Sequence, residues 1–212
     1  MMPVLIVLFI FAQALLLVYA AHRYLTLWRW ARGRDARRAA PPGPPARWPV
    51  VTVQLPLYNE RLVAERLIDA VAALDYPADR LQIQVLDDST DQTTACARDA
   101  AARHRARGLE IEVLHRSARN GFKAGALANG LDRARGEFIV VFDADFVPDP
   151  DFLKRAIPWF TDPRVGMVQA RWGHLNRGRS LLTAAQAAML DAHFLLEHEA
   201  RMRAGLFFNF NG

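Results

Sequence analysis

Apolar and polar positions change their spacing repeatedly between residues 50 and 202. Short apolar runs bounded by polar residues are typical of buried strands, and they cover residues 50–55, 81–86, 111–114, 138–142 and 165–170. Apolar residues at helical spacing predict helices over residues 61–74, 91–107, 123–135, 151–160 and 180–202. Alternation of this kind predicts an α/β fold with a mostly parallel sheet flanked by helices.

The first apolar run is longer and has a different meaning. Residues 3–21 contain Gln13 as the only strongly polar residue. At about 1.5 Å per residue this run approaches the thickness of a bilayer core, about 30 Å, which predicts a transmembrane helix. A cleaved signal peptide is the alternative, but it needs basic residues before the apolar run, and in this chain they follow it.

The basic residues and interfacial aromatics after this run set its predicted orientation. Six arginines precede the proline-rich stretch, and the aromatics are Tyr19, Tyr24, Trp28 and Trp30. The positive-inside rule places the N-terminus outside and the rest of the chain in the cytoplasm, at a bacterial inner membrane or its equivalent. The predicted organisation is an anchor over 1–24, a basic, proline-rich linker over 25–48, and an α/β domain over 49–212.

Composition narrows the class of protein further. The formal charge is +5, but the excess lies in the arginines before residue 40, so it does not indicate a nucleic-acid partner. Cys96 is the only cysteine, which excludes an intrachain disulfide and favours a reducing compartment.

Polar residues follow three of the predicted strands. These are the segment Pro56 to Glu60, the segment Asp87 to Asp91, and the pair Asp143 and Asp145. Because parallel strands end at the same edge of a sheet, at least four carboxylates are expected to converge there. Carboxylates crowd together most easily around a cation, and Mg²⁺ or Mn²⁺ suits such oxygens together with phosphate. Solvated turn aspartates, with Ser89 or Asp91 capping a helix, are the alternative.

A basic, glycine-containing loop over residues 116–125 enters the helix predicted from Lys123. Cationic side chains beside backbone amides at a helix N-terminus suit a diphosphate. The spacing is not that of a P-loop, and an ordinary turn with solvated cations is the alternative.

His193, Glu197 and His198 raise the question of a zinc site on the last helix. The two histidines are five residues apart, about 140° around an α-helix, so they are not expected to share a face. A zinc site is therefore rejected, and His193 with Glu197 is expected to form a local pair or a substrate-facing patch.

Five ordered motifs resemble those of family 2 glycosyltransferases with the GT-A fold, closest to the cellulose-synthase-like A and C β-mannan and β-glucan synthases and their bacterial relatives. They are VQLPLYNE (53–60), QVLDDSTD (84–91), NGFKAGAL (120–127), FDADF (142–146) and VQARW (168–172). The resemblance covers about residues 49–212, through the segment 207–212.

The resemblance implies a role for each matching position. Pro56, Tyr58 and Glu60 would border the nucleotide base and ribose, with Asp88 or Asp87 facing the base. Lys123 would approach the diphosphate, Asp143 would hold the sugar or ribose side, and Asp145, with Asp143, would ligate Mg²⁺ or Mn²⁺. Gln169, Arg171 and Trp172 would line the glycan acceptor site, with residues 208–212 near its end.

The implied reaction is inverting transfer of a hexose from a nucleotide sugar, GDP-mannose or UDP-glucose, to the non-reducing end of a β-linked glycan at a lipid bilayer. The family's general base, its Q-x-x-R-W helix and its later transmembrane segments have no counterpart in this sequence. The chain is therefore expected to be a truncated, inactive fragment. A tethered, non-catalytic nucleotide-sugar-binding scaffold stays open, as does a haloacid-dehalogenase-type phosphatase.

Overall fold

The computed structural model describes residues 2–33 and 42–207, which divide into two structural units. One unit contains residues 42–168 and holds the sheet. The other contains residues 2–33 together with 169–207 and is helical.

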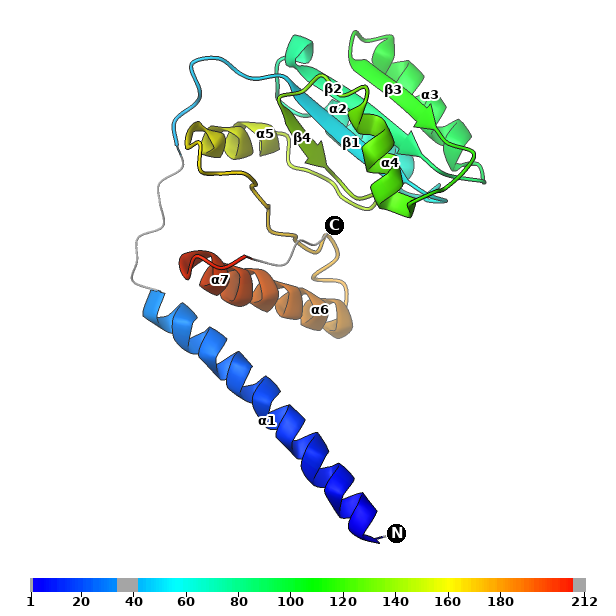
Figure 1. Cartoon of the computed structure of the whole chain (residues 1–212). Helices are drawn as coiled ribbons and strands as arrows, with labels where there is room; N and C mark the ends of the chain where they lie inside the picture. Colours follow the sequence, from blue (N-terminus) through cyan, green and yellow to red (C-terminus); the bar gives the residue numbers. More distant parts are fainter. Residues whose placement is uncertain (1, 34–41, 208–212) are drawn as a thin grey trace. The chain divides into compact units, whose positions relative to one another are not determined.

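The sheet consists of four parallel strands, as predicted. They are β1 (Val51–Leu57), β2 (Leu81–Asp87), β3 (Glu110–His115) and β4 (Phe138–Val141), in the order β3-β2-β1-β4 (Figure 1). The register places Leu57 opposite Asp87, and Asp87 opposite His115. Three strands therefore end level with one another at one edge, where ligands bind in open α/β sheets.

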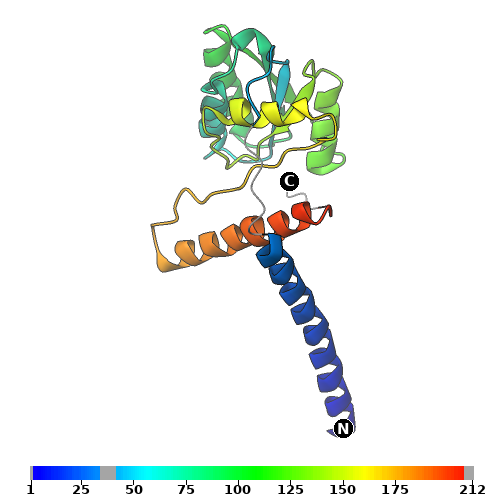
Figure 2. The same ribbon diagram turned by 90° about the vertical axis from the view of Figure 1, so that its left-hand side faces the viewer.

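Helices cover both faces of this sheet (Figures 1 and 2). They are α2 (Ala64–Ala72), η1 (Ala78–Arg80), α3 (Thr93–Arg105), α4 (Phe122–Leu131), α5 (Phe152–Ala156) and η2 (Ile157–Thr161). The first three predicted helices exist but are shorter, and the helix predicted over 151–160 consists of α5 and the 3-10 helix η2. Leu62, expected on the buried face of the first one, precedes α2 and is 87% exposed.

Strand alternation gives the two faces of the sheet different chemistry. Toward α2 and α3 lies the main apolar core, with side chains such as Val53, Ile83 and Leu67 fully buried. The face toward α4 is largely polar. There Thr52 donates to Gln82 at 2.7 Å, and Gln54 donates to Gln84 at 3.1 Å.

One predicted strand is wrong. Residues 165–170 form neither helix nor strand. An apolar run becomes a strand only when a neighbouring strand pairs with its backbone, and the described part of the chain offers this run no such partner. Gly166 and Gly173 further weaken an extended conformation in and after this run.

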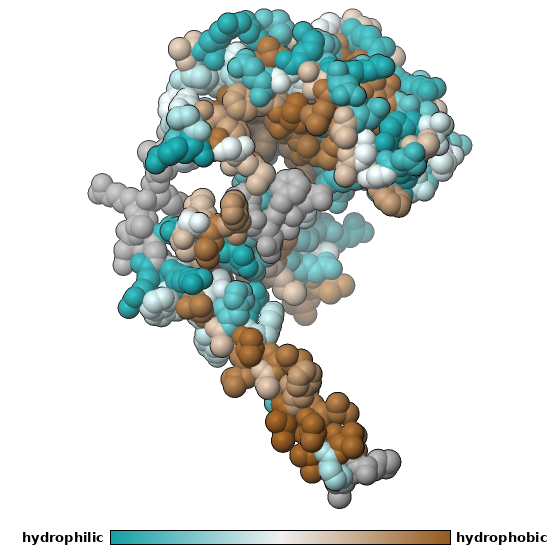
Figure 3. Space-filling view, viewed as in Figure 1, coloured by the Kyte–Doolittle hydropathy of each residue, from teal (hydrophilic) through white to brown (hydrophobic). Residues whose placement is uncertain are grey.

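The helical unit begins with α1 (Met2–Gly33), which extends well beyond the predicted residues 3–21. Residues 3–32 are long and apolar enough to cross a membrane, and the most apolar stretch is not buried by the rest of the protein (Figure 3). The predicted helix over 180–202 consists of α6 (Leu181–Ala192), the π-helical turn η3 (His193–His198) and α7 (Glu199–Arg203).

The expectation that His193 and His198 do not share a helix face is wrong, because this segment is π-helical. A π-helix bonds residue i to i+5, so it brings positions five apart onto one face. The rings of His193 and His198 accordingly lie 4.3 Å apart between centroids. The predicted local pair is confirmed, because His193 Nδ1 lies 3.4 Å from a Glu197 carboxylate oxygen.

Candidate functional site

The loops after β1 and β2 are joined to each other at the carboxyl edge of the sheet. The backbone N–H of Asn59 donates to Ser89 Oγ at 2.9 Å, and the N–H of Thr90 donates to Asn59 Oδ1 at 2.9 Å. Asn59 has a φ of +55°, a left-handed conformation that asparagine tolerates better than most residues. Ser89 therefore links the loop after β1 to the loop after β2. Of the two residues considered as helix caps, Asp91 accepts from the N–H of Thr93 at the start of α3.

Asp87 is fully buried, and both carboxylate oxygens face the protein. They accept from the N–H of Ser89 at 3.0 Å, from Thr94 Oγ1 at 2.6 Å and from His115 Nδ1 at 2.8 Å. Burial, the largest single influence, raises the pKa of Asp87, but these hydrogen bonds together outweigh it and hold the pKa below its ordinary value. Asp87 therefore joins the ends of β2, α3 and β3.

Asp88 is nearly buried and forms a bidentate ion pair with Arg116. The guanidinium donates to its two oxygens at 2.7 and 2.5 Å, which raises the pKa of Arg116. The same guanidinium donates to the backbone carbonyls of Asn120 and Phe122 at 3.2 and 3.1 Å. Arg116 thus holds the basic loop against the end of β2.

This loop depends on Gly125 for its close packing. A Cβ at this position would lie 2.0 Å from the backbone oxygen of Asn120 and 3.0 Å from a guanidinium nitrogen of Arg116. Any side chain at Gly125 would therefore displace the loop from Arg116.

Lys123, the second residue of α4, pairs with Asp143 at 2.5 Å. Asp143 begins the turn after β4, which is closed by the N–H of Phe146 donating to the Asp143 carbonyl at 3.0 Å. Asp145 lies on this turn, and the structure shows no hydrogen bond or ion pair from its carboxylate to another described residue. Its backbone oxygen accepts from Arg66 at 3.2 Å.

The expected convergence of at least four carboxylates is wrong. Among residues 2–33 and 42–207, no three His, Cys, Asp or Glu side chains lie close enough together to hold a metal ion. Asp88 and Asp143 are instead each held by a separate cation, Arg116 and Lys123 respectively. Arg116 and Lys123 of the basic loop therefore neutralise these two carboxylates, a role that was expected of a shared metal ion.

Asp143 and Asp145 nevertheless fit a hard divalent cation. Mg²⁺ is often bound by one or two carboxylates while substrate phosphates and water complete its coordination, so a third protein carboxylate is not required. Asp145 has its carboxylate uncommitted among the described residues, and Asp143 lies on the same turn. When bound there, such an ion would neutralise negative charge on a diphosphate.

Tyr58 and Arg119 form a contact that sequence reasoning missed. The guanidinium carbon of Arg119 lies 3.4 Å from the centre of the Tyr58 ring and 5.1 Å from that of Phe122. Arg119 belongs to the basic loop, but spacing alone gave no signal that it turns back toward the loop after β1. Pro56 is half-buried in β1, and the backbone oxygen of Glu60 accepts from two N–H groups at the start of α2.

Comparison with known proteins decides the family. The profile described as Glycosyl transferase family 2 matches residues 52–207, which is most of the chain. The chain belongs to this family. The match also removes the phosphatase alternative.

Two curated relatives of this family 2 glycosyltransferase chain are plant enzymes. Glucomannan 4-beta-mannosyltransferase 2 of Arabidopsis thaliana is 46% identical over 170 residues, which are 78% of this chain and 32% of that protein. Glucomannan 4-beta-mannosyltransferase 1 of Oryza sativa subsp. japonica is 43% identical over 170 residues, 78% of this chain and 33% of that protein. The chain therefore spans about a third of the length of the curated relatives it matches.

A solved structure supports the same fold. The mannosyltransferase PcManGT from Pyrobaculum calidifontis, in complex with GDP-Man and Mn²⁺, matches with a TM-score of 0.65 and 35% identity. The match covers 76% of this chain and 47% of that one. The sheet described above thus has the GT-A arrangement.

The three residues predicted for the acceptor lie in the helical unit of this family 2 chain. Arg171 lies 3.6 Å from a carboxylate oxygen of Asp191, and the ring of Trp172 lies 5.9 Å from that of Phe194. Gln169 precedes them in a stretch without helix or strand. Their acceptor role stays a prediction.

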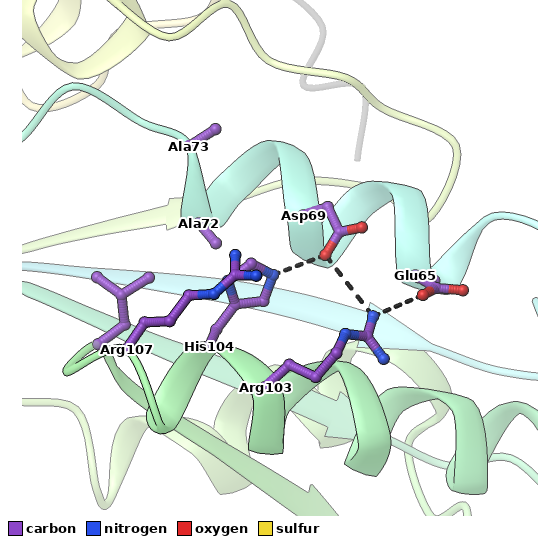
Figure 4. A pocket seen from close by; sticks show the side chains of 8 residues that line it. Glu65, Asp69, Ala72, Ala73, Arg103, His104 and Arg107 are labelled. Atoms are coloured by element: carbon purple, nitrogen blue, oxygen red, sulfur yellow. Dashed lines mark hydrogen bonds and ion pairs between the residues drawn. The ribbon is translucent and has the colours of Figure 1, made fainter.

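A hollow of about 640 Å³ lies elsewhere on this glycosyltransferase fold, between α2 and α3 (Figure 4). Its polar lining is largely self-paired. Arg103 pairs with Glu65 at 2.5 Å, and Asp69 lies 2.6 Å from His104 Nε2. The lining runs along α2 from Glu65 to Ala73 and along the last turns of α3, and it includes neither Lys123 nor the Asp143-to-Asp145 turn. The hollow therefore shares no lining residue with the candidate site at the strand ends.

Proposed function

We propose that residues 42–168 bind the nucleoside diphosphate of a nucleotide sugar together with Mg²⁺ or Mn²⁺. The observation that carries this proposal is the Asp143-to-Asp145 turn at the end of β4, with Lys123 of α4 bonded to Asp143 at 2.5 Å. It brings the two requirements of a diphosphate side by side, a pair of carboxylates for the metal and a cation for the phosphates.

The whole protein is proposed to be an inverting hexosyltransferase that extends a β-linked polysaccharide. A hydroxyl of the glycan acceptor gives its proton to a general base and attacks the anomeric carbon of the donor, and the bond from this carbon to the diphosphate oxygen breaks. Lys123 is proposed to stabilise the charge on the leaving diphosphate. GDP-mannose is preferred to UDP-glucose, because the relatives are named as mannosyltransferases and one solved relative holds GDP-Man.

Asp88 is proposed to contact the base, in preference to Asp87. Both carboxylates accept hydrogen bonds through both oxygens, but their partners differ. Asp87 is bonded to Ser89, Thr94 and His115, whereas Asp88 is bonded to Arg116 of the basic loop, which is proposed to lie at the diphosphate. Pro56, Tyr58 and Glu60 are proposed to border the base and ribose. Gln169, Arg171 and Trp172 are proposed to contact the acceptor.

Anchoring in a bilayer through α1 is part of the proposal. The exposed apolar side chains of this helix suit lipid, and its later turns carry interfacial pairs, such as Arg32 over the Trp28 ring at 4.1 Å. With the arginines on the cytoplasmic side, residues 42–168 face the cytoplasm.

Calorimetry on the full chain in detergent tests the donor site. We expect GDP to bind in the presence of Mn²⁺, and to lose at least about tenfold in affinity when a chelator is present or when Asp145 is changed to Asn, since the metal bridges carboxylate and phosphate. Asp99→Asn, on the exposed face of α3, is the matched control and should bind as the wild type does. Equal affinity with and without chelator would contradict the proposal.

A non-catalytic, nucleotide-sugar-binding scaffold is the second candidate. A panel of nucleotide sugars, tested for transfer by the protein encoded by the whole gene, separates the two. Donor binding without transfer to any β-linked acceptor would favour the scaffold.

A further inference from the structure

Arg119 is held in an unusual way for a charged side chain beside a polar edge. Its guanidinium stacks on Tyr58 at 3.4 Å and also approaches the Phe122 ring at 5.1 Å. Its Nε atom is buried and has no hydrogen-bond partner among the described residues. The Tyr58 ring attracts the positive charge of the guanidinium, but it gives the Nε–H group no hydrogen-bond acceptor.

The three cations of the basic segment therefore differ in their commitments. Arg116 is fixed by both oxygens of Asp88, and Lys123 is fixed by Asp143. Within the described ranges 2–33 and 42–207, the structure records ring contacts for Arg119 but no ion pair with a carboxylate. Of the three cations, Arg119 can therefore change partner without leaving a carboxylate unpaired.

Tyr58 lies next to the residues that hold the basic loop. The N–H of Asp88 donates to the carbonyl of Leu57, the residue before Tyr58, at 3.0 Å. Asp88 is bonded in turn to Arg116, three residues before Arg119. The face of Tyr58 that Arg119 covers is therefore turned toward the loop that the proposed donor site uses.

We propose that Arg119 has two alternative positions, one on the Tyr58 ring and one on the phosphates of a bound nucleoside diphosphate. The nucleobase takes the face of Tyr58 as Arg119 leaves it, and the guanidinium then meets the phosphate charge beside Lys123. This inference rests on the proposed donor function. It makes Arg119 a specificity-determining residue that discriminates a nucleoside diphosphate from a nucleoside, because a ligand without phosphates displaces the guanidinium and gives it no negative charge to bind.

The proposal predicts opposite effects of one substitution on two ligands. Arg119→Met removes the phosphate contact, so we expect the affinity for GDP with Mg²⁺ to fall by about tenfold. The same variant removes the competitor for the Tyr58 face, so we expect the affinity for guanosine to rise by about threefold. The two affinities are measured on the full chain in detergent, by calorimetry for GDP and by ligand-observed NMR for guanosine.

Three further variants complete the design. Lys123→Met should weaken GDP binding without strengthening guanosine binding, because Lys123 is paired with Asp143 and does not compete for the Tyr58 face. Arg107→Met, in the hollow between α2 and α3, should change neither affinity. Arg119→Lys should recover part of the GDP affinity, because it restores a positive charge.

The outcomes separate this inference from the donor function. If the wild type binds no nucleoside diphosphate, the donor function is refuted and the inference with it. If the wild type binds GDP but Arg119→Met weakens guanosine and GDP equally, Arg119 stays on Tyr58 as part of the binding surface and the exchange is refuted. No change with either ligand refutes it as well.

A direct observation of Arg119 gives an independent measurement. Stacking on Tyr58 should shift the Nε–H proton of Arg119 upfield in a nitrogen-15 spectrum, with the signal assigned by its loss in Arg119→Lys. Adding GDP with Mg²⁺ should return this proton to the position of an unstacked arginine. A proton that keeps its upfield shift at saturating GDP would overturn the proposal.

Discussion

Replacing Asp87 with Ala should destabilise the sheet domain strongly. The carboxylate is fully buried and accepts three hydrogen bonds, at 2.6, 2.8 and 3.0 Å. His115 is partly exposed and Thr94 has the Ser89 carbonyl within 3.5 Å, so these two donors can find other partners. The backbone N–H of Ser89 belongs to a buried residue, so it would lose the acceptor that Asp87 provides and gain none from water. Since hydrogen bonds to a charged group are worth about 1.5 to 3 kcal/mol each, we expect a net loss of about 3 kcal/mol.

Amide hydrogen exchange in the full chain measures this loss where it should occur. A loss of about 3 kcal/mol corresponds to roughly a hundredfold lower protection for amides of β2 and β3 that exchange by global unfolding. Asp87→Asn keeps an acceptor for Ser89 and should lose less. Asp99→Ala, at an exposed position of α3, is the control and should stay within about threefold of the wild type.

The stabilisation by Asp87 should also depend on pH. Hydrogen bonds hold its pKa in the folded protein below the ordinary value of 3.8, so the folded state favours the charged carboxylate. The contribution is therefore complete above that value and is lost as the pH falls through the lower pKa of the folded state. In thermal unfolding at about pH 7, 5 and 3, the difference between wild type and Asp87→Asn should persist at the first two and shrink at the third. Unchanged protection in Asp87→Ala, or a difference that does not depend on pH, would refute this reasoning.

The remaining predictions concern the loops and the hollow. Asp88→Asn should weaken GDP binding by about tenfold while Asp87→Asn, once folded, binds within about threefold of the wild type, because of the two carboxylates only that of Asp88 is bonded to the basic loop; calorimetry compares them, and equal losses would contradict the assignment. Gly125→Ala should lower GDP affinity by at least about tenfold in the same assay, because its Cβ would meet the Asn120 oxygen at 2.0 Å; wild-type affinity would show that the loop position is unimportant. Single and double Ala variants of Asp69 and His104 should give a coupling of only about 0.5 to 1 kcal/mol in unfolding experiments, since Asp69 is half exposed; a coupling above about 2 kcal/mol would be too large for this pair.

The parallel sheet could be predicted because buried parallel strands read as continuous apolar runs between turn residues. The same pattern failed over residues 165–170, because apolar composition does not supply the neighbouring strand that a ladder requires. The polar face under α4 was also missed. Gln54 and Gln84 are buried because they satisfy each other across the strands, which composition alone does not reveal.

The candidate site was predictable in its location but not in its electrostatics. Strand ends and motifs pointed to Asp88, Lys123, Asp143 and Asp145, and the structure places these residues at loops following the strands or at the start of α4. The spacing of the motifs did not predict the ion pairs that Arg116 forms with Asp88 and Lys123 forms with Asp143. On α6 to α7, a helical period of about 3.6 separated His193 from His198, whereas the single π-helical turn brings them together. Local departures of this kind depend on packing, which the pattern does not encode.

The polar face of the sheet and the position of Lys123 belong to one arrangement. Gln54 donates both to Gln84 at 3.1 Å and to the backbone oxygen of Leu127 in α4 at 3.4 Å. Later in α4, a Cβ at Gly130 would lie 2.5 Å from the Gln54 amide, so the helix approaches β1 more closely than any side chain would allow. An apolar contact at this point would permit α4 to slide, whereas directional hydrogen bonds fix its height over the strands. Because Lys123 is the second residue of this helix, the height of α4 decides whether its ammonium reaches Asp143. The buried glutamines therefore contribute to the proposed donor site through the helix that they hold, although they lie outside that site.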